Sequence, residues 1–210
     1  MSPRVIEAVA KNTKLMPNFN VPFQAGSNEV LQNMKRGYTI ERYMEIINNI
    51  RTLIPDAAIV GDCIVGFPGE TEEQFQETLE VMKKVKFEQL NTAAYSPRPN
   101  TPAALWENQI PEDIKQDRLQ RINRLGAEHA LERSLRFVNR IESVLVEDVN
   151  IKNPKQVYGR IPHGRLVYFD GNLQELKGKI IKVKITEAKP YSLVGSIVDS
   201  KDIINEREYI

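Results

Sequence analysis

The stretch from Ile54 to Thr71 constrains the fold of this chain more than any other part of it. After the break at Pro55 it runs through a largely apolar segment and turns at Gly66-Phe67-Pro68-Gly69. A helix begins at Thr71, where Thr71 and Gln74 predict a capping box. Such a run is typical of a buried parallel strand that leads into its crossover helix. Ligands bind these sheets just beyond the carboxyl ends of the strands, so the turn either binds a ligand or only connects two elements.

Similar strand–loop–helix units flank this stretch on both sides. Their apolar spacing and capping residues, among them Ser27 before residue 28, predict helices over residues 5–10, 28–35, 40–53 and 72–85. Strands are predicted over residues 19–23 and 87–95. A long charged helix is expected from residue 112 to about residue 139. Three such units in a row predict a parallel sheet or part of an α/β barrel.

The pattern changes near Ile141, where short segments of alternating polarity begin. These segments cover residues 143–147, 156–159, 165–169, 178–187 and 192–198, and turn residues separate them. Five short strands in some sixty residues predict a small antiparallel barrel of the OB type. We therefore expect an α/β domain over residues 1–139, a β-barrel domain over residues 140–203, and a polar tail over residues 204–210.

Composition narrows the chemistry that this chain can perform by itself. Its one cysteine, Cys63, excludes internal disulfides and excludes an iron–sulfur or cysteine-rich zinc site built from this chain alone, so no metal ligands are predicted. A cysteine inside an apolar strand is expected to behave as a small hydrophobic side chain. No apolar run approaches a membrane span and no signal peptide is evident, which predicts a cytoplasmic location.

Three loops are expected to converge at the carboxyl ends of the predicted strands, namely residues 24–27, 66–70 and 95–98. They offer glycine amides, hydroxyls, one carboxylate and one guanidinium, a set that suits a polar ligand bearing a ribose and a carboxylate. The alternative is ordinary turn chemistry. No nucleophile–base pair occurs in these loops, so no catalytic residue is predicted in this chain.

The later domain shows a mild basic excess, because residues 140–189 carry 10 Lys/Arg against 6 Asp/Glu, whereas residues 1–139 carry 17 against 18. Arg160, Arg165 and Tyr168 interleave basic and aromatic side chains there. Small barrels of the OB type use such faces to bind single-stranded RNA. The alternative is a solvated rim over a packed aromatic core.

Longer blocks of sequence resemble one known family. Residues 21–38, 62–71 and 91–104 resemble three motif blocks of the radical S-adenosylmethionine methylthiotransferases, and residues 143–198 resemble the TRAM RNA-binding domain that ends these enzymes. The sequence of these blocks is most similar to that of the tRNA branch of the family, which makes 2-methylthio-N6-dimethylallyladenosine. The resemblance implies the C-terminal half of a partial (β/α) barrel followed by an OB-like barrel.

This resemblance implies a cofactor site, a reaction and a partner. The family uses S-adenosylmethionine and two 4Fe–4S clusters to methylthiolate C2 of the modified adenosine beside the anticodon, so the partner would be the tRNA anticodon stem-loop. The positions that correspond to the family's cofactor site lie in the three loops: Gln24, Gly26, Ser27, Gly66, Pro68, Gly69, Glu70, Ser96 and Arg98. Ser96 and Arg98 would lie at the mouth, towards cofactor or substrate.

The sequence departs from the family pattern at important positions. The cysteines of the C-x-x-x-C-x-x-C cluster motif are missing and would be expected upstream of Met1, so we expect the isolated chain to be inactive and to need the missing N-terminal half. Asn20, Ala25 and Asn100 replace the family's usual residues. Two alternatives remain: an RNA-binding remnant without catalysis, and a methylthiotransferase that acts on an aspartate of a ribosomal protein.

Overall fold

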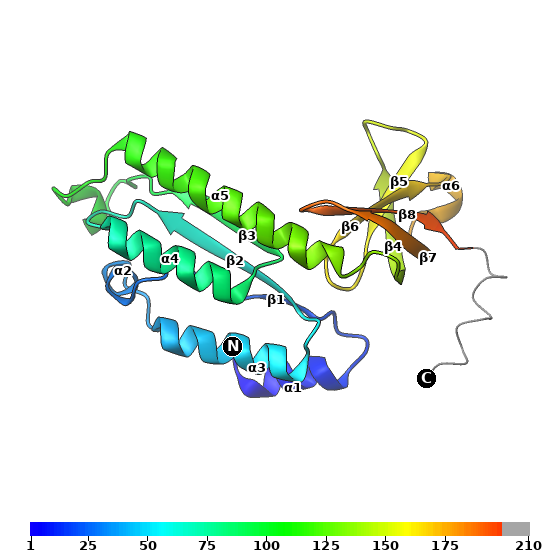
Figure 1. Cartoon of the computed structure of the whole chain (residues 1–210), viewed down its shortest axis with the longest axis horizontal. Coiled ribbons are helices and arrows are strands. Elements are labelled where there is room, and N and C mark those ends of the chain that lie inside the picture. The colour runs from blue at the N-terminus through cyan, green and yellow to red at the C-terminus, as the bar shows by residue number, and fades with distance from the viewer. Residues whose placement is uncertain (199–210) are drawn as a thin grey trace. The chain divides into compact units, whose positions relative to one another are not determined.

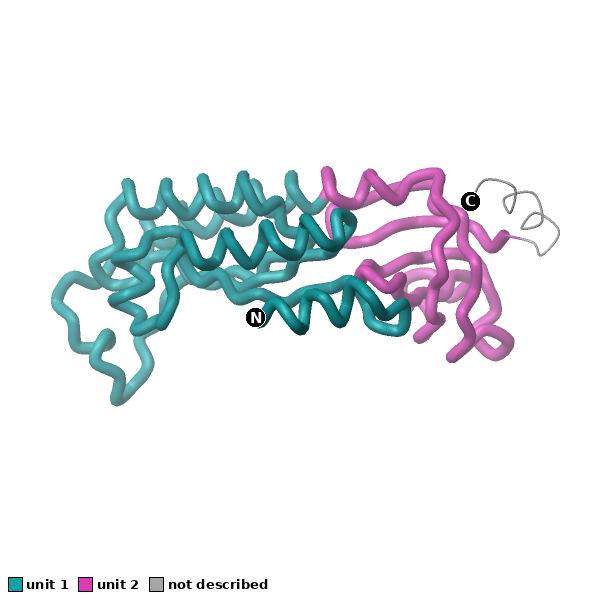
Figure 2. The backbone as a smooth tube through the Cα atoms, turned by 90° about the horizontal axis from the view of Figure 1, so that it is seen from below, with its two compact units in different colours: residues 1–130 teal, residues 131–210 magenta. Residues whose placement is uncertain are grey.

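The computed structural model describes residues 1–198 and divides the chain into two compact units (Figure 1; Figure 2). The first unit comprises residues 1–130, and the second begins at Leu131. The predicted boundary, after residue 139, lies further along the chain than this division. The residues between the two positions include Phe137, which is fully buried in the core of the second unit. The predicted tail, residues 204–210, and residues 199–203 lie outside the described part.

The first unit is built from α/β elements in the predicted order. They are α1 (Pro3–Lys11), β1 (Asn18–Asn20), α2 (Asn28–Asn33), α3 (Ile40–Leu53), β2 (Ala58–Val65), α4 (Glu72–Val85), β3 (Gln89–Ala94), a 3₁₀ helix η1 (Pro102–Leu105) and α5 (Glu112–Leu135), which continues into the second unit. The capping box predicted at Thr71 is present, with reciprocal bonds between Thr71 and Gln74. Ser27 occupies the N-cap of α2, but its side chain makes no capping bond, contrary to expectation.

Strand β2 is the centre of a three-stranded parallel sheet of order β1-β2-β3. Its neighbours are fixed in register by pairs such as Phe19 with Ile59 and Cys63 with Thr92. The strand predicted over residues 19–23 ends at Asn20. Backbone hydrogen bonds to β2 nevertheless continue past this point, since the amides of Val21 and Phe23 donate to the carbonyls of Val60 and Asp62 at 2.8 and 3.3 Å.

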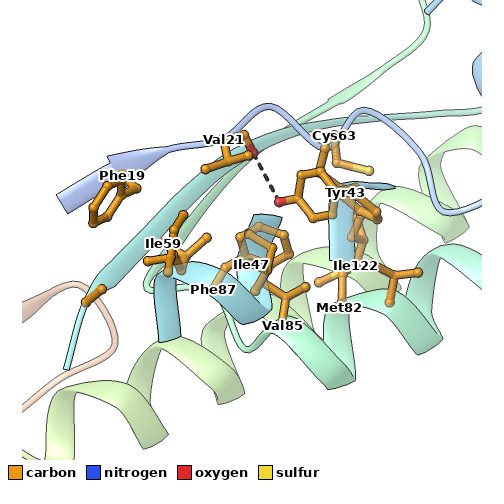
Figure 3. Packing of buried hydrophobic residues seen from close by; sticks show 14 of the residues in the cluster. Phe19, Val21, Tyr43, Ile47, Ile59, Cys63, Met82, Val85, Phe87 and Ile122 are labelled. Atoms are coloured by element: carbon orange, nitrogen blue, oxygen red, sulfur yellow. Dashed lines mark hydrogen bonds between the residues drawn. The ribbon is translucent and has the colours of Figure 1, made fainter. Parts of the chain in front are cut away.

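Helices cover one face of this sheet and form the core of the unit (Figure 3). Phe23 packs against Tyr43 and Phe87, with ring centroids 5.6 Å apart in both pairs. The buried Tyr43 hydroxyl donates a 3.1 Å hydrogen bond to the Val21 carbonyl. Cys63 is 1% exposed and burial raises the pKa of its thiol, so it behaves as the small hydrophobic side chain that its sequence context predicts.

The opposite face of the sheet is polar and partly exposed. Asn91 donates to a carboxylate oxygen of Asp62 at 3.0 Å, and Gln89 donates to the Asn91 side chain at 3.1 Å. Among residues 1–198, β1 and β3 each pair with β2 alone within this sheet. The sheet therefore differs from a parallel sheet covered by helices on both faces.

The second unit is a closed five-stranded barrel of order β4-β5-β6-β8-β7, which confirms the predicted fold class. Its elements are β4 (Ile141–Val149), β5 (Gln156–Arg160), β6 (Leu166–Asp170), a short helix α6 (Leu173–Leu176), β7 (Ile180–Ala188) and β8 (Ser192–Ile197). All neighbouring pairs are antiparallel except β6 with β8, which is parallel. One parallel pair is unavoidable, because strands cannot alternate in direction around a closed ring with an odd number of members.

None of the helices within residues 1–198 is both long enough and apolar enough to cross a membrane.

Candidate functional site

The turn that follows β2 is held rigidly by its backbone. Gly66 and Gly69 adopt φ values of 71° and 83°, a region that favours glycine, and the amide of Glu70 donates to the Phe67 carbonyl at 2.9 Å. The amide of Gly69 donates to the carbonyl of Asn108 at the same distance. The turn is therefore tied to the segment that precedes α5.

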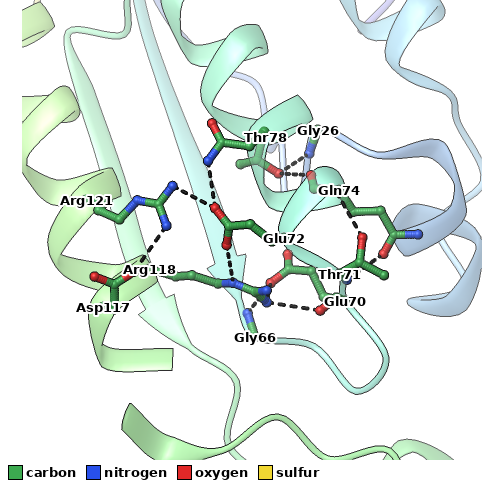
Figure 4. A network of polar contacts seen from close by, with 11 residues as sticks. Gly26, Gly66, Glu70, Thr71, Glu72, Gln74, Thr78, Asp117, Arg118 and Arg121 are labelled. Carbon is green, nitrogen blue, oxygen red and sulfur yellow. Dashed lines mark hydrogen bonds and ion pairs between the residues drawn. The ribbon is translucent and has the colours of Figure 1, made fainter. Parts of the chain in front are cut away.

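The buried side chain of Glu70 holds the turn together through hydrogen bonds (Figure 4). Its Oε2 accepts a 2.6 Å bond from the Gly66 amide and a 2.8 Å bond from Nη1 of Arg118, which also donates to the Glu70 carbonyl at 3.1 Å. The side chains of Glu70 and Arg118 are 0% and 5% exposed. The only carboxylate of the predicted cofactor loops is thus bound within the chain.

Three further charged side chains extend this network along α4 and α5. Glu72 Oε1 lies 2.8 Å from Nη2 of Arg121, which also pairs with Asp117 at 3.1 Å, the i,i+4 contact that the sequence contains. The hydrogen bond from Arg121 is the largest influence that lowers the pKa of Glu72. Burial instead raises the pKa of Glu70, and this effect exceeds the opposing effects of the Gly66 amide and Arg118.

The loop of Gln24, Gly26 and Ser27 is packed against the chain itself. Gly26 donates its amide to Oγ1 of Thr78 at 2.9 Å, and a Cβ atom at this position would lie 2.3 Å from the Thr78 Cα. Gln24, with φ of 67°, accepts the Ile64 amide and is 8% exposed, and Ser27 is 4% exposed. Close packing on α4 accounts for the glycine without any ligand.

A cavity of about 510 Å³ lies at the carboxyl ends of β2 and β3. Residues after β2, after β3, after α2 and around η1 contribute to its wall. The wall includes Asn33, Met34, Lys35, Arg36, Ile64, Phe67, Ala93, Ala94, Tyr95, Ser96, Arg98, Thr101, Pro102, Ala103 and Trp106. The volume lies in the range of small-molecule binding sites.

Aromatic side chains form one continuous part of this wall. The ring of Phe67 meets Tyr95 and Trp106 edge to face, at centroid distances of 5.1 and 5.6 Å. Gln109 fixes the Trp106 loop by donating to the carbonyls of Ala103 and Trp106, at 2.8 and 2.9 Å. The buried Tyr95 hydroxyl has no hydrogen-bond partner among residues 1–198, so a ligand could supply one.

Three exposed basic side chains also line the cavity beside this aromatic and apolar wall: Lys35, Arg36 and Arg98. A flat aromatic ligand that carries an apolar substituent and an adjacent anionic group matches these three properties together. The sequence motif contained Met34 and Arg36, but no polarity pattern placed them beside Trp106. That proximity arises from the fold.

The structure separates the nine positions expected at the cofactor site into two sets. Ser96 and Arg98 line the cavity, as part of its exposed rim. The others position the loops, and their exposed surface is small: Gln24, Gly26, Ser27, Gly66, Pro68, Gly69 and Glu70. Gly66 and Gly69 are closed off by the chain itself, since added Cβ atoms would meet side chains of Lys115 and Asn108 at 2.3 and 2.4 Å.

The 210 residues do not fit an iron–sulfur cluster. The chain has one cysteine, Cys63, which is 1% exposed and packed in the core of the first unit. Residues 1–198 contain no group of three or more His, Cys, Asp or Glu side chains that could hold a metal ion. Cluster ligands are therefore absent from these residues.

The RNA-binding positions expected in the second unit are also separated. Arg165 is 5% exposed and donates to the Pro190 carbonyl at 2.7 Å, so it is unavailable on the surface. Arg160 is half exposed and forms an ion pair with Glu147. Tyr168 packs beside Tyr158, with ring centroids 5.8 Å apart.

Comparison with protein-family models gives two matches, one in each unit. Residues 1–82 match the radical SAM superfamily, and residues 135–198 match the TRAM domain. Together they indicate a radical SAM plus TRAM architecture. The first match covers the strand β2 and the turn after it, and the second covers the complete barrel, so each match agrees with the fold of its unit.

Proposed function

We propose that this chain is part of a radical SAM enzyme that modifies RNA, and specifically a tRNA methylthiotransferase acting at C2 of N6-dimethylallyladenosine beside the anticodon. The observation that carries the proposal is the cavity, with its aromatic and apolar wall and its cationic rim, in a chain that also bears a TRAM domain. RNA-modifying enzymes need such a pocket, because a base must leave its stack before its ring atoms can be reached.

The proposed substrate has three parts that the wall can accommodate separately. Phe67 and Trp106 offer aromatic surface to the purine, while Met34 and Ile64 offer apolar surface to the five-carbon substituent. Arg98 and the neighbouring cations are exposed, where they can meet the phosphates on either side of the base. The arrangement therefore supports a prenylated nucleoside within RNA better than an aspartate side chain.

S-adenosylmethionine, when bound, would supply the methyl group and the radical chemistry of the family. Ser96 and Arg98 are the expected cofactor positions that remain open to a ligand, while Glu70 and the glycines hold the turn beside them. The cluster ligands would come from polypeptide outside these 210 residues, since Cys63 is buried.

The chain contains its own reporter for a test, because Trp106 is its one tryptophan and lines the cavity. Two fluorescein-labelled anticodon stem-loops, with N6-dimethylallyladenosine or plain adenosine, are titrated into the full chain. Anisotropy measures binding and tryptophan emission measures occupation of the cavity. We expect the prenylated loop to bind at least about tenfold tighter, as burial of a few methylene groups implies, and to change the emission of Trp106.

The outcome also decides the second candidate, an RNA-binding protein without catalysis, which the single buried cysteine favours. Equal binding of both loops with unchanged tryptophan emission would support that candidate and contradict the methylthiotransferase proposal. A Trp106→Phe variant is the control, because it must abolish the emission change while leaving the anisotropy titration measurable.

A further inference from the structure

The outward face of β7 carries an unusual combination of side chains. Lys182 and Lys184 alternate with the buried Val183 and Ile185, so both lysines point to the outer surface of the barrel. Ile180, on the same side, is 70% exposed. Lys179 precedes the strand and is exposed as well.

Strand β4 extends this face. Ser143 pairs with Lys182 and Leu145 pairs with Ile180 in the antiparallel ladder, so the paired side chains lie on one surface. Leu145 is 46% exposed. We call Leu145, Ile180, Lys182 and Lys184 the β4–β7 face, and the exposed Lys179 lies at its end, just before the strand.

The charge of this face is not compensated. Residues 1–198 contain no ion-pair partner for Lys179, Lys182 or Lys184, whereas the neighbouring acidic side chains are engaged elsewhere. These acidic residues pair with other cations: Glu147 with Arg160, Asp148 with Lys177 and Glu187 with Lys189. Three positive charges therefore remain beside two exposed aliphatic side chains.

The face expected from the sequence, which we call the Tyr158–Tyr168 face, differs from the β4–β7 face in its charge. Arg160 is neutralised by Glu147, and Arg165 is buried, so Tyr158 and Tyr168 lie on a surface without net charge from these groups. Affinity for nucleic acid comes largely from lysine and arginine side chains that displace counterions from phosphates. A neutralised arginine contributes little to that effect.

We infer that the β4–β7 face, and not the Tyr158–Tyr168 face, is where the barrel contacts the RNA backbone. The three lysines neutralise phosphates, and Ile180 and Leu145 cover the sugar edges between them. This inference rests on the proposed function, because the TRAM match makes RNA the polyanion that the charges fit. An acidic protein is the competing partner.

The test uses the full chain and a fluorescein-labelled anticodon stem-loop, with binding measured by anisotropy over a range of salt concentrations. The variant Lys182→Gln/Lys184→Gln removes two charges from the face. The matched control Lys152→Gln/Lys155→Gln removes two exposed charges from the loop between β4 and β5 of the same barrel. A third protein, Arg160→Gln, tests the face expected from the sequence. Thermal melting verifies that all variants remain folded.

We expect the Lys182/Lys184 variant to lose tenfold or more in affinity, by an order-of-magnitude estimate, and about 1.4–1.8 in the slope of log K against log salt concentration. The control and Arg160→Gln should stay within about threefold of the unaltered chain. Equal losses in both double variants, or a loss confined to Arg160→Gln, would overturn the assignment of the face. Failure of the unaltered chain to bind RNA would instead overturn the proposed function, and an acidic protein would become the partner to examine.

Discussion

Two arginine–glutamate pairs in this chain have the same chemistry and opposite surroundings. In the first unit Glu70 and Arg118 lie 2.8 Å apart with side chains 0% and 5% exposed, whereas in the barrel Glu147 and Arg160 are 31% and 47% exposed. The buried pair holds a turn beside the cavity and uses the polar atoms of that turn. The exposed pair holds no loop and only cancels charge. Burial therefore decides whether an arginine–glutamate pair supports local structure or only neutralises charge at the surface.

The largest effect should follow removal of the buried cation. Arg118→Met leaves Glu70 charged and buried, and loss of one partner of such a pair costs about 3–5 kcal/mol of unfolding free energy. Urea unfolding monitored through Trp106 reports on the first unit. Arg124→Met, an exposed arginine on the same helix, is the control. A loss of similar size in both variants would show that the Glu70 contact has no special weight.

A smaller effect should come from the packing behind the turn. Gly26→Ala would place a Cβ atom 2.3 Å from the Thr78 Cα, and we expect overpacking of this kind to cost about 1–3 kcal/mol. Gly37→Ala meets nothing within 4 Å and should leave stability nearly unchanged. The same tryptophan-monitored unfolding compares the two. Equal stabilities would mean that the loop moves away from α4 freely.

The pH dependence of stability should distinguish two carboxyl groups of one network. Burial raises the pKa of Glu70 above its ordinary value of 4.5, so the native state binds this proton more tightly than the unfolded state. The unfolding free energy of the unaltered chain minus that of Glu70→Gln should therefore increase as pH falls from 7 towards about 4.5.

Glu72 provides the contrast within that experiment. Its pKa is lowered, chiefly by Arg121, so its contribution is present above the ordinary carboxyl value and is lost as pH falls through its native-state pKa. The difference between the unaltered chain and Glu72→Gln should thus decrease below about pH 4.5. Parallel curves for Glu70→Gln and Glu72→Gln would contradict the assignment of opposite shifts.

The smallest effect should follow loss of the exposed pair. Arg160→Ala removes a surface contact of a kind that contributes about 0–1 kcal/mol, so the melting temperature of the barrel should hardly change. Circular dichroism of the full chain measures it. A destabilisation as large as that of Arg118→Met would remove the distinction between the two pairs.

Local sequence signals were sufficient for most of the fold. The apolar run at residues 58–65, the Thr71 capping box and the alternating segments of the barrel each depend on neighbouring residues, and the structure confirms them. The first strand, Asn18–Asn20, is shorter than predicted, although the amides of Val21 and Phe23 still donate to carbonyls of β2. The 3₁₀ helix over Pro102–Leu105 and the short helix α6 were not predicted, since each contains only four residues.

The site was harder to predict, because it depends on contacts between distant residues. Arg118 is 48 positions from Glu70 and lies in a charged helix whose pattern indicates only a solvated face. Phe67 was read as part of a turn, and its contacts with Tyr95 and Trp106 arise from three separate segments. Likewise, no sequence pattern around Arg165 indicates that its side chain is buried and bound to the Pro190 carbonyl.

The position of β8 has a consequence for how the barrel is made. This last strand lies between β6 and β7, so the ring is complete only when residues 192–197 have been added to both neighbours. Strands β4, β5 and β6 can pair in sequence order, but closure requires contacts between residues far apart in the chain, which form slowly. On a ribosome the barrel therefore stays open until its final strand has emerged, and folding of this unit must follow synthesis of the lysine-bearing strand β7.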